Sequence, residues 1–110
     1  MSNIYEVSFS LILNAGNANS KSIMAIEKAR NFEFADAKEL INSAEVDLRI
    51  AHQSQTDLIQ DEAKGKKTDL SILLIHAQDH MTRAMISLDH AKEFVHIYEL
   101  ISKLIVKEEL

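Results

Sequence analysis

The stretch ILLIHAQDHMTRAM, residues 72–85, decides how the chain folds. An apolar run leads directly into four ionisable residues, His76, Asp79, His80 and Arg83. At offsets of three, four and seven residues from the first, these side chains share one face of a helix over two turns. The same face continues through Leu73, Ser87, Ala91 and Phe94. We therefore expect it to be buried, and buried ionisable groups are normally paired, bound to a metal or functional.

The composition around this stretch is typical of a few long helices. The chain has 110 residues, no Pro, two Gly and 46% hydrophobic residues, which suits one domain with a single core. Apolar residues recur at helical intervals. Turn signals occur at Asn31, the expected left-handed residue, and at Gly65, and Thr68 is a candidate N-cap. We predict an all-α fold in which residues 1–110 form an antiparallel, up-down-up three-helix bundle. The predicted helices span about 2–31, 34–63 and 69–106.

Residues 14–20 are unusual for the interior of the first predicted helix. They are rich in Asn and small side chains, and propensity alone predicts a break there. Apolar periodicity resumes beyond them, so we predict a continuous helix. The small side chains would let a neighbouring helix approach closely.

Composition also excludes several classes of function. A net charge of −5 without a long basic tract disfavours nucleic-acid binding. The lack of cysteine excludes disulfides, thiolate zinc sites and a cysteine nucleophile. The N-terminus has no basic-then-apolar signal, and no apolar run approaches the ~20 residues that span a bilayer. These features predict a soluble, cytoplasmic protein.

The polar residues of the third helix are expected to have polar neighbours. Counting from the predicted turns places His52 and Gln55 level with residues 77–80, and residues 9–14 of the first helix in the same layer. One interpretation is a layer of satisfied polar groups that sets the register of the helices. An oligomeric interface would relieve the crowding, because the polar face could then line a crevice between protomers.

Two chemical interpretations stand beside this structural one. His76 and His80 have the spacing of two imidazole metal ligands, with Asp79 as an oxygen ligand, although Ala77 stands where a zinc protease needs Glu. Alternatively, a neutral His76 is a nucleophile for phosphoryl transfer. Its donors would be His80, Arg83, Gln78 or a neighbouring protomer. The residues alone leave both interpretations open.

The segment His76-Ala77-Gln78-Asp79-His80 resembles a motif of the IIA component of the lactose/cellobiose (N,N'-diacetylchitobiose) class of the bacterial sugar phosphotransferase system. The family pattern there is close to LLVHAQDHLMTAM. Residues 13–18, LNAGNA, resemble the family's first-helix motif, and residues 51–56, AHQSQT, its second-helix motif A-H-x-x-Q-T. The three motifs occur in the family's order and spacing, so the resemblance covers the whole chain.

This resemblance implies a phosphoryl carrier that acts during uptake of a lactose/cellobiose-type disaccharide. His76 would accept a phosphoryl group from the histidine phosphocarrier protein and pass it to a cysteine of the IIB component. Gln78, His80 and Arg83 would support it, and contact with the membrane would be indirect, through the sugar permease. The alternative function is a non-catalytic helical oligomerisation or metal-binding module.

The resemblance also implies an assembly. Three-helix protomers would form a homotrimer, a nine-helix bundle, with one Asp79 from each protomer at the trimer axis. A divalent cation such as magnesium would bind there, because clustered carboxylates repel unless a cation or shared protons neutralise them.

Two departures from the family pattern concern positive charge. The family usually has L-M-T-A where this chain has Met81-Thr82-Arg83-Ala84, and often has Arg where this chain has Asn19. We hypothesise that Arg83 supplies the positive charge near the phosphohistidine that the first-helix Arg would otherwise supply.

Overall fold

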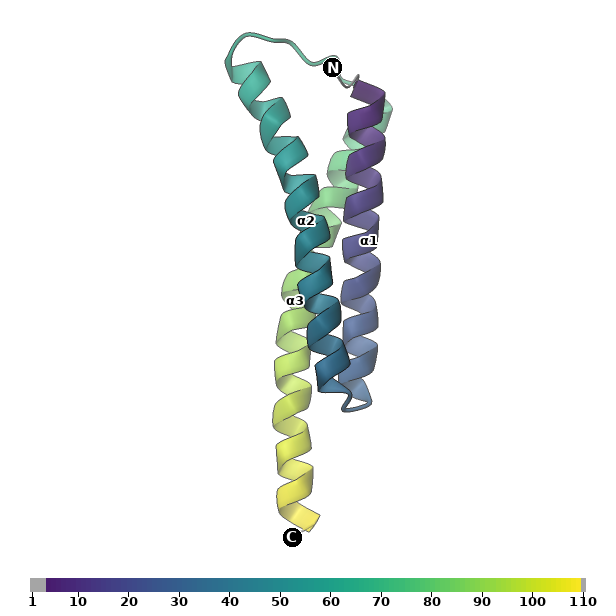
Figure 1. Cartoon of the computed structure of the whole chain (residues 1–110), viewed down its shortest axis with the longest axis vertical. Helices are drawn as coiled ribbons and strands as arrows, with labels where there is room; N and C mark the ends of the chain where they lie inside the picture. Colours follow the sequence, from purple (N-terminus) through teal and green to yellow (C-terminus); the bar gives the residue numbers. More distant parts are fainter. Residues whose placement is uncertain (1–3, 110) are drawn as a thin grey trace.

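Three long helices form the protein. The computed structural model describes residues 4–109, with side chains for residues 4–105. Helix α1 spans Ile4–Arg30, α2 spans Phe34–Ala63 and α3 spans Ile72–Glu109. Consecutive helices run antiparallel (Figure 1). The predicted all-α three-helix architecture is confirmed.

The helices pack through seams with a seven-residue repeat. On α3 the buried positions alternate at intervals of three and four residues from Leu74 to Val95, as in helices that supercoil around one another. Alanine fills most of the core positions, which allows the helix axes to approach closely. Ser8 and Ser22 are also buried, and each hydroxyl donates a 2.8 Å hydrogen bond to the carbonyl four residues earlier. The buried residues of α1 are Ser8, Leu11, Ala15, Ala18, Ser22, Ala25 and Ala29.

Helix α1 continues through residues 14–20, as predicted. The side-chain amide of Asn14 donates a 2.9 Å hydrogen bond to the backbone carbonyl of Ser10, so this polar side chain is satisfied without breaking the helix. Ala15 and Ala18 are fully buried against the other helices. The small side chains of residues 14–20 therefore allow the other helices to pack closely against α1.

The first chain reversal corrects one prediction. Phe32, not Asn31, is the left-handed residue, with a φ of 64°. The N–H groups of Phe32 and Glu33 donate 2.9 Å hydrogen bonds to carbonyls in the last turn of α1, the pattern of a Schellman helix end. Gly65 terminates α2 with a φ of 89°, as predicted.

Helix α3 begins at residue 72, three residues later than predicted, and ends at 109 instead of about 106. Ser71, not Thr68, caps it, because Ser71 Oγ accepts a 3.1 Å hydrogen bond from the N–H of Leu74. The first helix ends at Arg30, one residue early. Its predicted start at residue 2 lies outside the described residues.

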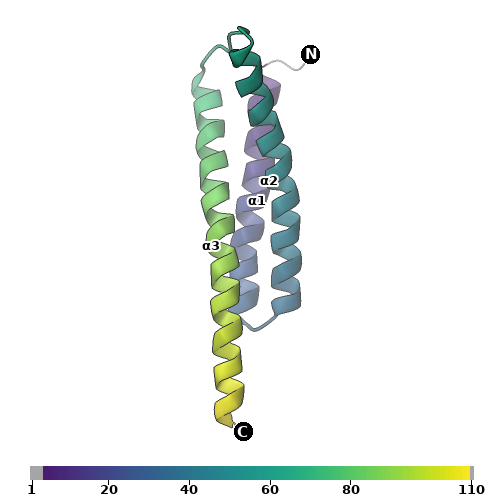
Figure 2. The same cartoon turned by 90° about the vertical axis from the view of Figure 1, so that its left-hand side faces the viewer.

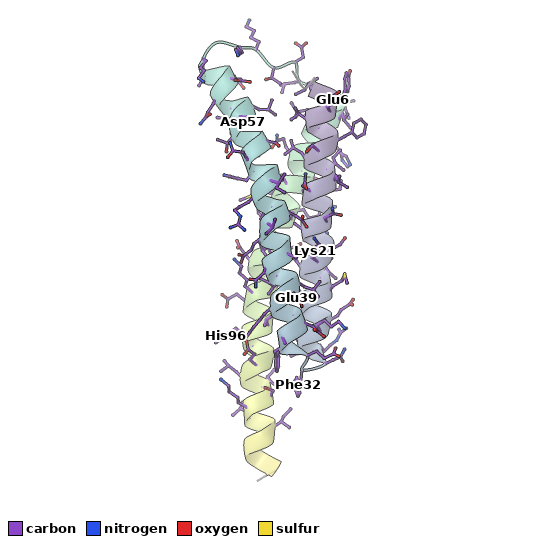
Figure 3. All side chains as sticks on the ribbon, in the orientation of Figure 1. Glu6, Lys21, Phe32, Glu39, Asp57 and His96 are labelled. Atoms are coloured by element: carbon purple, nitrogen blue, oxygen red, sulfur yellow. The ribbon has the colours of Figure 1, made fainter. Side chains whose placement is uncertain are left out.

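The protomer is long and thin. It measures 65 × 20 × 20 Å, and its radius of gyration is 17.7 Å, compared with about 13 Å for a compact domain of this length. Helix α2 diverges from α1 toward its C-terminal end (Figure 1). The last part of α3 projects beyond the turn between α1 and α2 (Figure 2). The side chains drawn on this projecting part have no other helix beside them (Figure 3).

The elongated shape leaves much apolar surface uncovered. The accessible surface is 7504 Å², whereas a compact protein of this mass exposes about 6,100 Å². Large apolar side chains are exposed on all three helices. Within the described part of the chain, no helix has both the length and the apolar character needed to cross a membrane.

Candidate functional site

The ionisable residues of α3 lie outside the protomer core. The core face carries Leu74, Ala77 and Met81 instead, whereas the side chains of Asp79 and Arg83 are 61% and 60% exposed. The prediction that their face is buried in the protomer is therefore wrong. The reason is helical phase: the seam follows Leu74, Ala77 and Met81, and at about 100° per residue the ionisable residues lie on the other side of α3.

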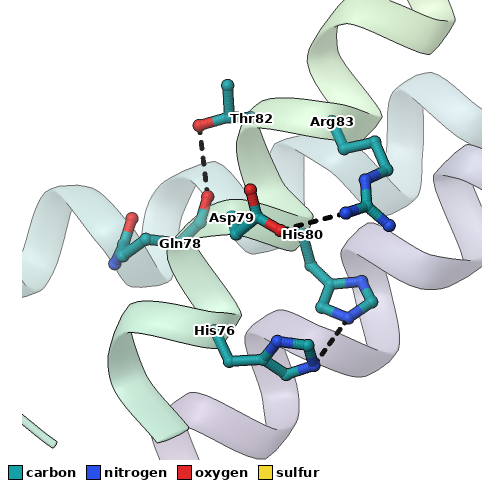
Figure 4. A network of polar contacts seen from close by, with 6 residues as sticks. All are labelled: His76, Gln78, Asp79, His80, Thr82 and Arg83. Atoms are coloured by element: carbon teal, nitrogen blue, oxygen red, sulfur yellow. Dashed lines mark hydrogen bonds and ion pairs between the residues drawn. The ribbon is translucent and has the colours of Figure 1, made fainter. Parts of the chain in front are cut away.

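His76 and His80 form a pair on this outer surface. Their Nε2 atoms are 3.0 Å apart, and their rings meet edge to face with centroids 4.5 Å apart. His76 is exposed and His80 is half-buried. Both rings point toward the α1 side of the helix (Figure 4). One nitrogen must donate and the other accept, so this contact couples the proton position of one ring to that of the other.

Asp79 and Arg83 form a second pair, one helical turn apart. Arg83 Nη2 donates to Asp79 Oδ2 at 3.0 Å, with the acid on the N-terminal side, the more favourable order on a helix. Figure 4 shows this pair beside the two histidine rings. The four ionisable residues of the motif thus divide into two pairs.

Gln78 points away from both pairs (Figure 4). Its Oε1 accepts a short hydrogen bond from Gln55 Nε2, which joins α3 to α2. Its backbone carbonyl accepts a 3.2 Å hydrogen bond from Thr82 Oγ1. The predicted level of Gln55 beside residues 77–80 is confirmed, and in the protomer Gln78 acts as a link between helices.

The two departures from the family pattern make different contacts. Asn19 Oδ1 accepts a hydrogen bond from Ser87 Oγ, which joins α1 to α3. Arg83 pairs with Asp79, and among the described side chains it makes no hydrogen bond to His76. The structure therefore assigns the guanidinium to the carboxylate, and its role near a phosphohistidine stays a hypothesis.

His52 lines a groove between α2 and α3. The groove has a volume of about 250 Å³, and His52 shares it with Met81 and Met85. His52 therefore lies beside Met81 and Met85, slightly beyond the predicted residues 77–80, and the groove wall is mainly apolar and does not contain His76.

The protomer does not assemble a complete metal site from its own described residues. No three His, Cys, Asp or Glu side chains among them come close enough to hold an ion. Asp79 offers one carboxylate, and one of its oxygens already accepts from Arg83. A metal here would require carboxylates from several copies of the chain.

An exposed apolar stripe along α3 was missed by sequence reasoning. This outer stripe lies opposite the core seam and consists of Ile75, Ile86, Ile97, Leu100 and Leu104, each 46–62% exposed. Asp79 lies on the stripe, four residues after its first member and seven before its second. The available signal was a second set of apolar residues at helical intervals of 11, 11, 3 and 4, superimposed on the repeat of the core.

Comparison with known proteins agrees with the resemblance in the motifs. The model of the family described as "PTS system, Lactose/Cellobiose specific IIA subunit" matches residues 6–99. The "Lichenan-specific phosphotransferase enzyme IIA component" of Bacillus subtilis is 39% identical over 98 residues, which cover 89% of this chain and 89% of that protein.

Solved structures share both sequence and fold with this chain. The PTS cellobiose-specific enzyme IIA from Bacillus anthracis has a TM-score of 0.88 and 41% identity, covering 94% of this chain and 95% of its own. The Escherichia coli IIA(chitobiose), solved in a complex with HPr, has a TM-score of 0.80 and 31% identity, covering 93% and 99%. The similarity therefore extends along nearly the whole chain.

Proposed function

Because this chain belongs to the lactose/cellobiose-specific IIA family of the phosphotransferase system, we propose that its His76 accepts and donates the phosphoryl group. The chain is an enzyme component of the lactose/cellobiose/chitobiose branch of that sugar-transport system. One observation supports His76 in particular. It is an exposed imidazole within the HAQDH motif, and its Nε2 lies 3.0 Å from a second imidazole nitrogen.

The reaction consists of two phosphoryl transfers. A ring nitrogen of neutral His76 attacks the phosphorus of a phosphohistidine on the phosphocarrier protein. The nitrogen–phosphorus bond at His76 forms as the bond on the carrier breaks, and the electron pair returns to the carrier's imidazole. A cysteine thiolate of the IIB component then attacks the same phosphorus, and His76 regains its electron pair.

His80 is the supporting residue nearest to the reacting ring. When His80 Nε2 carries the proton, it donates to His76 Nε2 and keeps that nitrogen deprotonated, and this hydrogen bond must open before the His76 lone pair can attack the phosphorus. After the transfer, the same N–H of His80 can donate to a phosphoryl oxygen and stabilise its charge. Gln78 supports the site indirectly, by holding α2 level with α3 through Gln55.

The phosphoryl donor and acceptor are other proteins of the system. The structure of IIA(chitobiose) from Escherichia coli is a complex with HPr, the histidine phosphocarrier. We extend that donor to this chain, because the two chains share fold and sequence over almost their full length. The acceptor is a IIB component, since a IIA component passes its phosphoryl group onward.

The working unit in this proposal is a homotrimer. Three copies would pack their outer stripes together, covering apolar surface that the protomer leaves exposed. The Asp79 carboxylates would then converge on the axis of a nine-helix bundle. Three carboxylates at one axis need positive charge beside them, and a divalent cation such as magnesium is one candidate, because hard cations take carboxylate oxygens as ligands.

The transported sugar in this proposal is a disaccharide of the lactose/cellobiose type. Relatives of similar identity are named for lichenan, lactose, cellobiose, galactose and N,N'-diacetylchitobiose. These names differ although the proteins are alike, so we place sugar selection in the membrane permease.

A phosphorylation assay tests the assignment of His76. The chain is incubated with phosphoenolpyruvate, enzyme I and the phosphocarrier, and intact mass is measured before and after acid treatment. We expect one acid-labile phosphoryl group on the wild type and on a His96→Ala control, and none on His76→Ala. No label on the wild type would favour the alternative, a non-catalytic oligomerisation module, and a label that survives His76→Ala would place the nucleophile elsewhere.

A further inference from the structure

The ion pair between Asp79 and Arg83 has an unusual setting. Arg83 Nη2 lies 3.0 Å from Asp79 Oδ2, and both side chains are about three-fifths exposed in the protomer. An exposed pair of this kind contributes little to the stability of one protomer, because water screens it. Its position is what matters, since Asp79 interrupts an apolar stripe between Ile75 and Ile86.

Packing outer stripes together changes the environment of this carboxylate. In the proposed trimer each copy brings one Asp79 to the axis, where apolar neighbours displace water. Like charges gathered in such a place repel strongly, and an unpaired buried charge is strongly unfavourable. Each copy also brings its own Arg83, already bonded to the carboxylate, so the axis carries equal numbers of opposite charges.

We infer that Arg83 is the built-in counter-ion of the Asp79 cluster, so that this chain assembles without a divalent cation. The inference rests on the proposed trimer. Arg83 and a cation compete for the same carboxylate, because one of its two oxygens, Asp79 Oδ2, already accepts from the guanidinium. A cation that enters must displace Arg83 or add positive charge to an axis that is already neutral. Arg83 therefore weakens cation binding at Asp79.

Oligomeric state in the absence and presence of the metal tests this inference. The molar mass of the wild type, Arg83→Ala and the double variant Asp79→Asn/Arg83→Ala is measured by size exclusion with light scattering. Each is run in excess EDTA and then in millimolar magnesium chloride. Arg30→Ala, the same change at the far end of α1, serves as the matched control.

We expect the wild type and Arg30→Ala to be trimers in both buffers. Arg83→Ala should dissociate in EDTA, with a midpoint concentration for assembly at least about tenfold higher than that of the wild type, and magnesium should restore it. The double variant has neither charge and should form trimers in EDTA. This recovery would show that Arg83→Ala fails through an unpaired carboxylate and not through misfolding.

Other outcomes overturn the inference, and they separate it from the trimer itself. A wild type that is a trimer only with magnesium would show that Arg83 does not replace the cation. Arg83→Ala trimers in EDTA would show that no counter-ion is required. A wild type that is monomeric in both buffers would contradict the trimer as well. Calorimetric titration with magnesium adds a direct measurement, in which Arg83→Ala should bind the ion at least about tenfold more tightly than the wild type.

Discussion

Two imidazole rings one helical turn apart form the centre of the candidate site. Because the Nε2 atoms of His76 and His80 lie 3.0 Å apart, they cannot both point a lone pair or both point a proton along the line between them. The proton on the second ring thus keeps the facing nitrogen of the first deprotonated, and their hydrogen bond must open before that nitrogen can attack a phosphorus. This arrangement gives His80 a chemical task that a merely structural residue would not have.

We therefore expect His80→Ala to slow phosphoryl transfer to His76 while leaving the fold intact. The rate of phosphorylation by the phosphocarrier should fall by about tenfold or more, because a donor to the transferring group is lost. Stopped samples analysed by intact mass give this rate. His80→Gln keeps an N–H donor and should recover part of the loss.

His96→Ala is the matched control, since His96 is an exposed histidine on the same helix, away from the pair. Its rate should equal that of the wild type. If His80→Ala also phosphorylates at the wild-type rate, His80 has no role in the transfer.

Sequence spacing predicted part of this site and not the rest. The four-residue interval brings His76 to His80, and counting from the turns brings Gln55 to Gln78, because helix geometry determines both. The partner of Arg83 was not predictable in the same way. Long side chains on one helix face can reach several neighbours, so spacing alone does not choose between Asp79 and the histidines.

At the level of the helices, the ends were the least predictable features. Thr68 and Ser71 are both good N-caps and lie three residues apart, so each is compatible with a helix start. The divergence of α2 toward its C-terminal end (Figure 1) demands a longer connection, which selects Ser71. Similarly, Phe32 replaces the expected Asn31 at φ of 64°, where its ring stacks on Phe34 with centroids 5.8 Å apart.

The two glycines offer a matched test of backbone conformation. A Cβ added at Gly16 or at Gly65 meets nothing within 4 Å, so only the backbone distinguishes the two positions. Gly16 lies inside α1, where Ala is preferred, and Gly16→Ala should raise the free energy of unfolding by about 0.5–1 kcal/mol. Gly65 has a φ of 89°, so Gly65→Ala should lower it by about 1 kcal/mol.

Urea unfolding followed by circular dichroism, at one protein concentration for all variants, gives both values. A rise for Gly65→Ala would contradict the left-handed end described for α2, and a fall for Gly16→Ala would contradict the open position of Gly16 inside α1.

At the scale of the whole molecule, the hydrophobic periodicity of α3 has two causes. Helix α3 is apolar on two opposite faces, because one face packs against α1 and α2 and the other forms the outer stripe. Hydrophobic periodicity in a single chain adds these two patterns together and does not say which face lies inside the protomer. This is why the three-helix fold was predictable, whereas the exposed position of the HAQDH residues was not.

One charged substitution in the outer stripe tests the proposed trimer. Ile86 is 51% exposed and lies one seven-residue repeat beyond Asp79. Covering its exposed half contributes about 1 kcal/mol per protomer. A glutamate there would lose that contribution, and desolvating its charge would cost several kcal/mol more.

Light scattering of the wild type should give about three times the 12.4 kDa mass of the chain, and Ile86→Glu should give the mass of one chain. Val46→Glu is the control, because Val46 is 48% exposed but lies on the side of α2 away from its core seam, and it should remain a trimer. Trimeric Ile86→Glu, or a monomeric wild type, would exclude the outer stripe as the surface that joins the protomers.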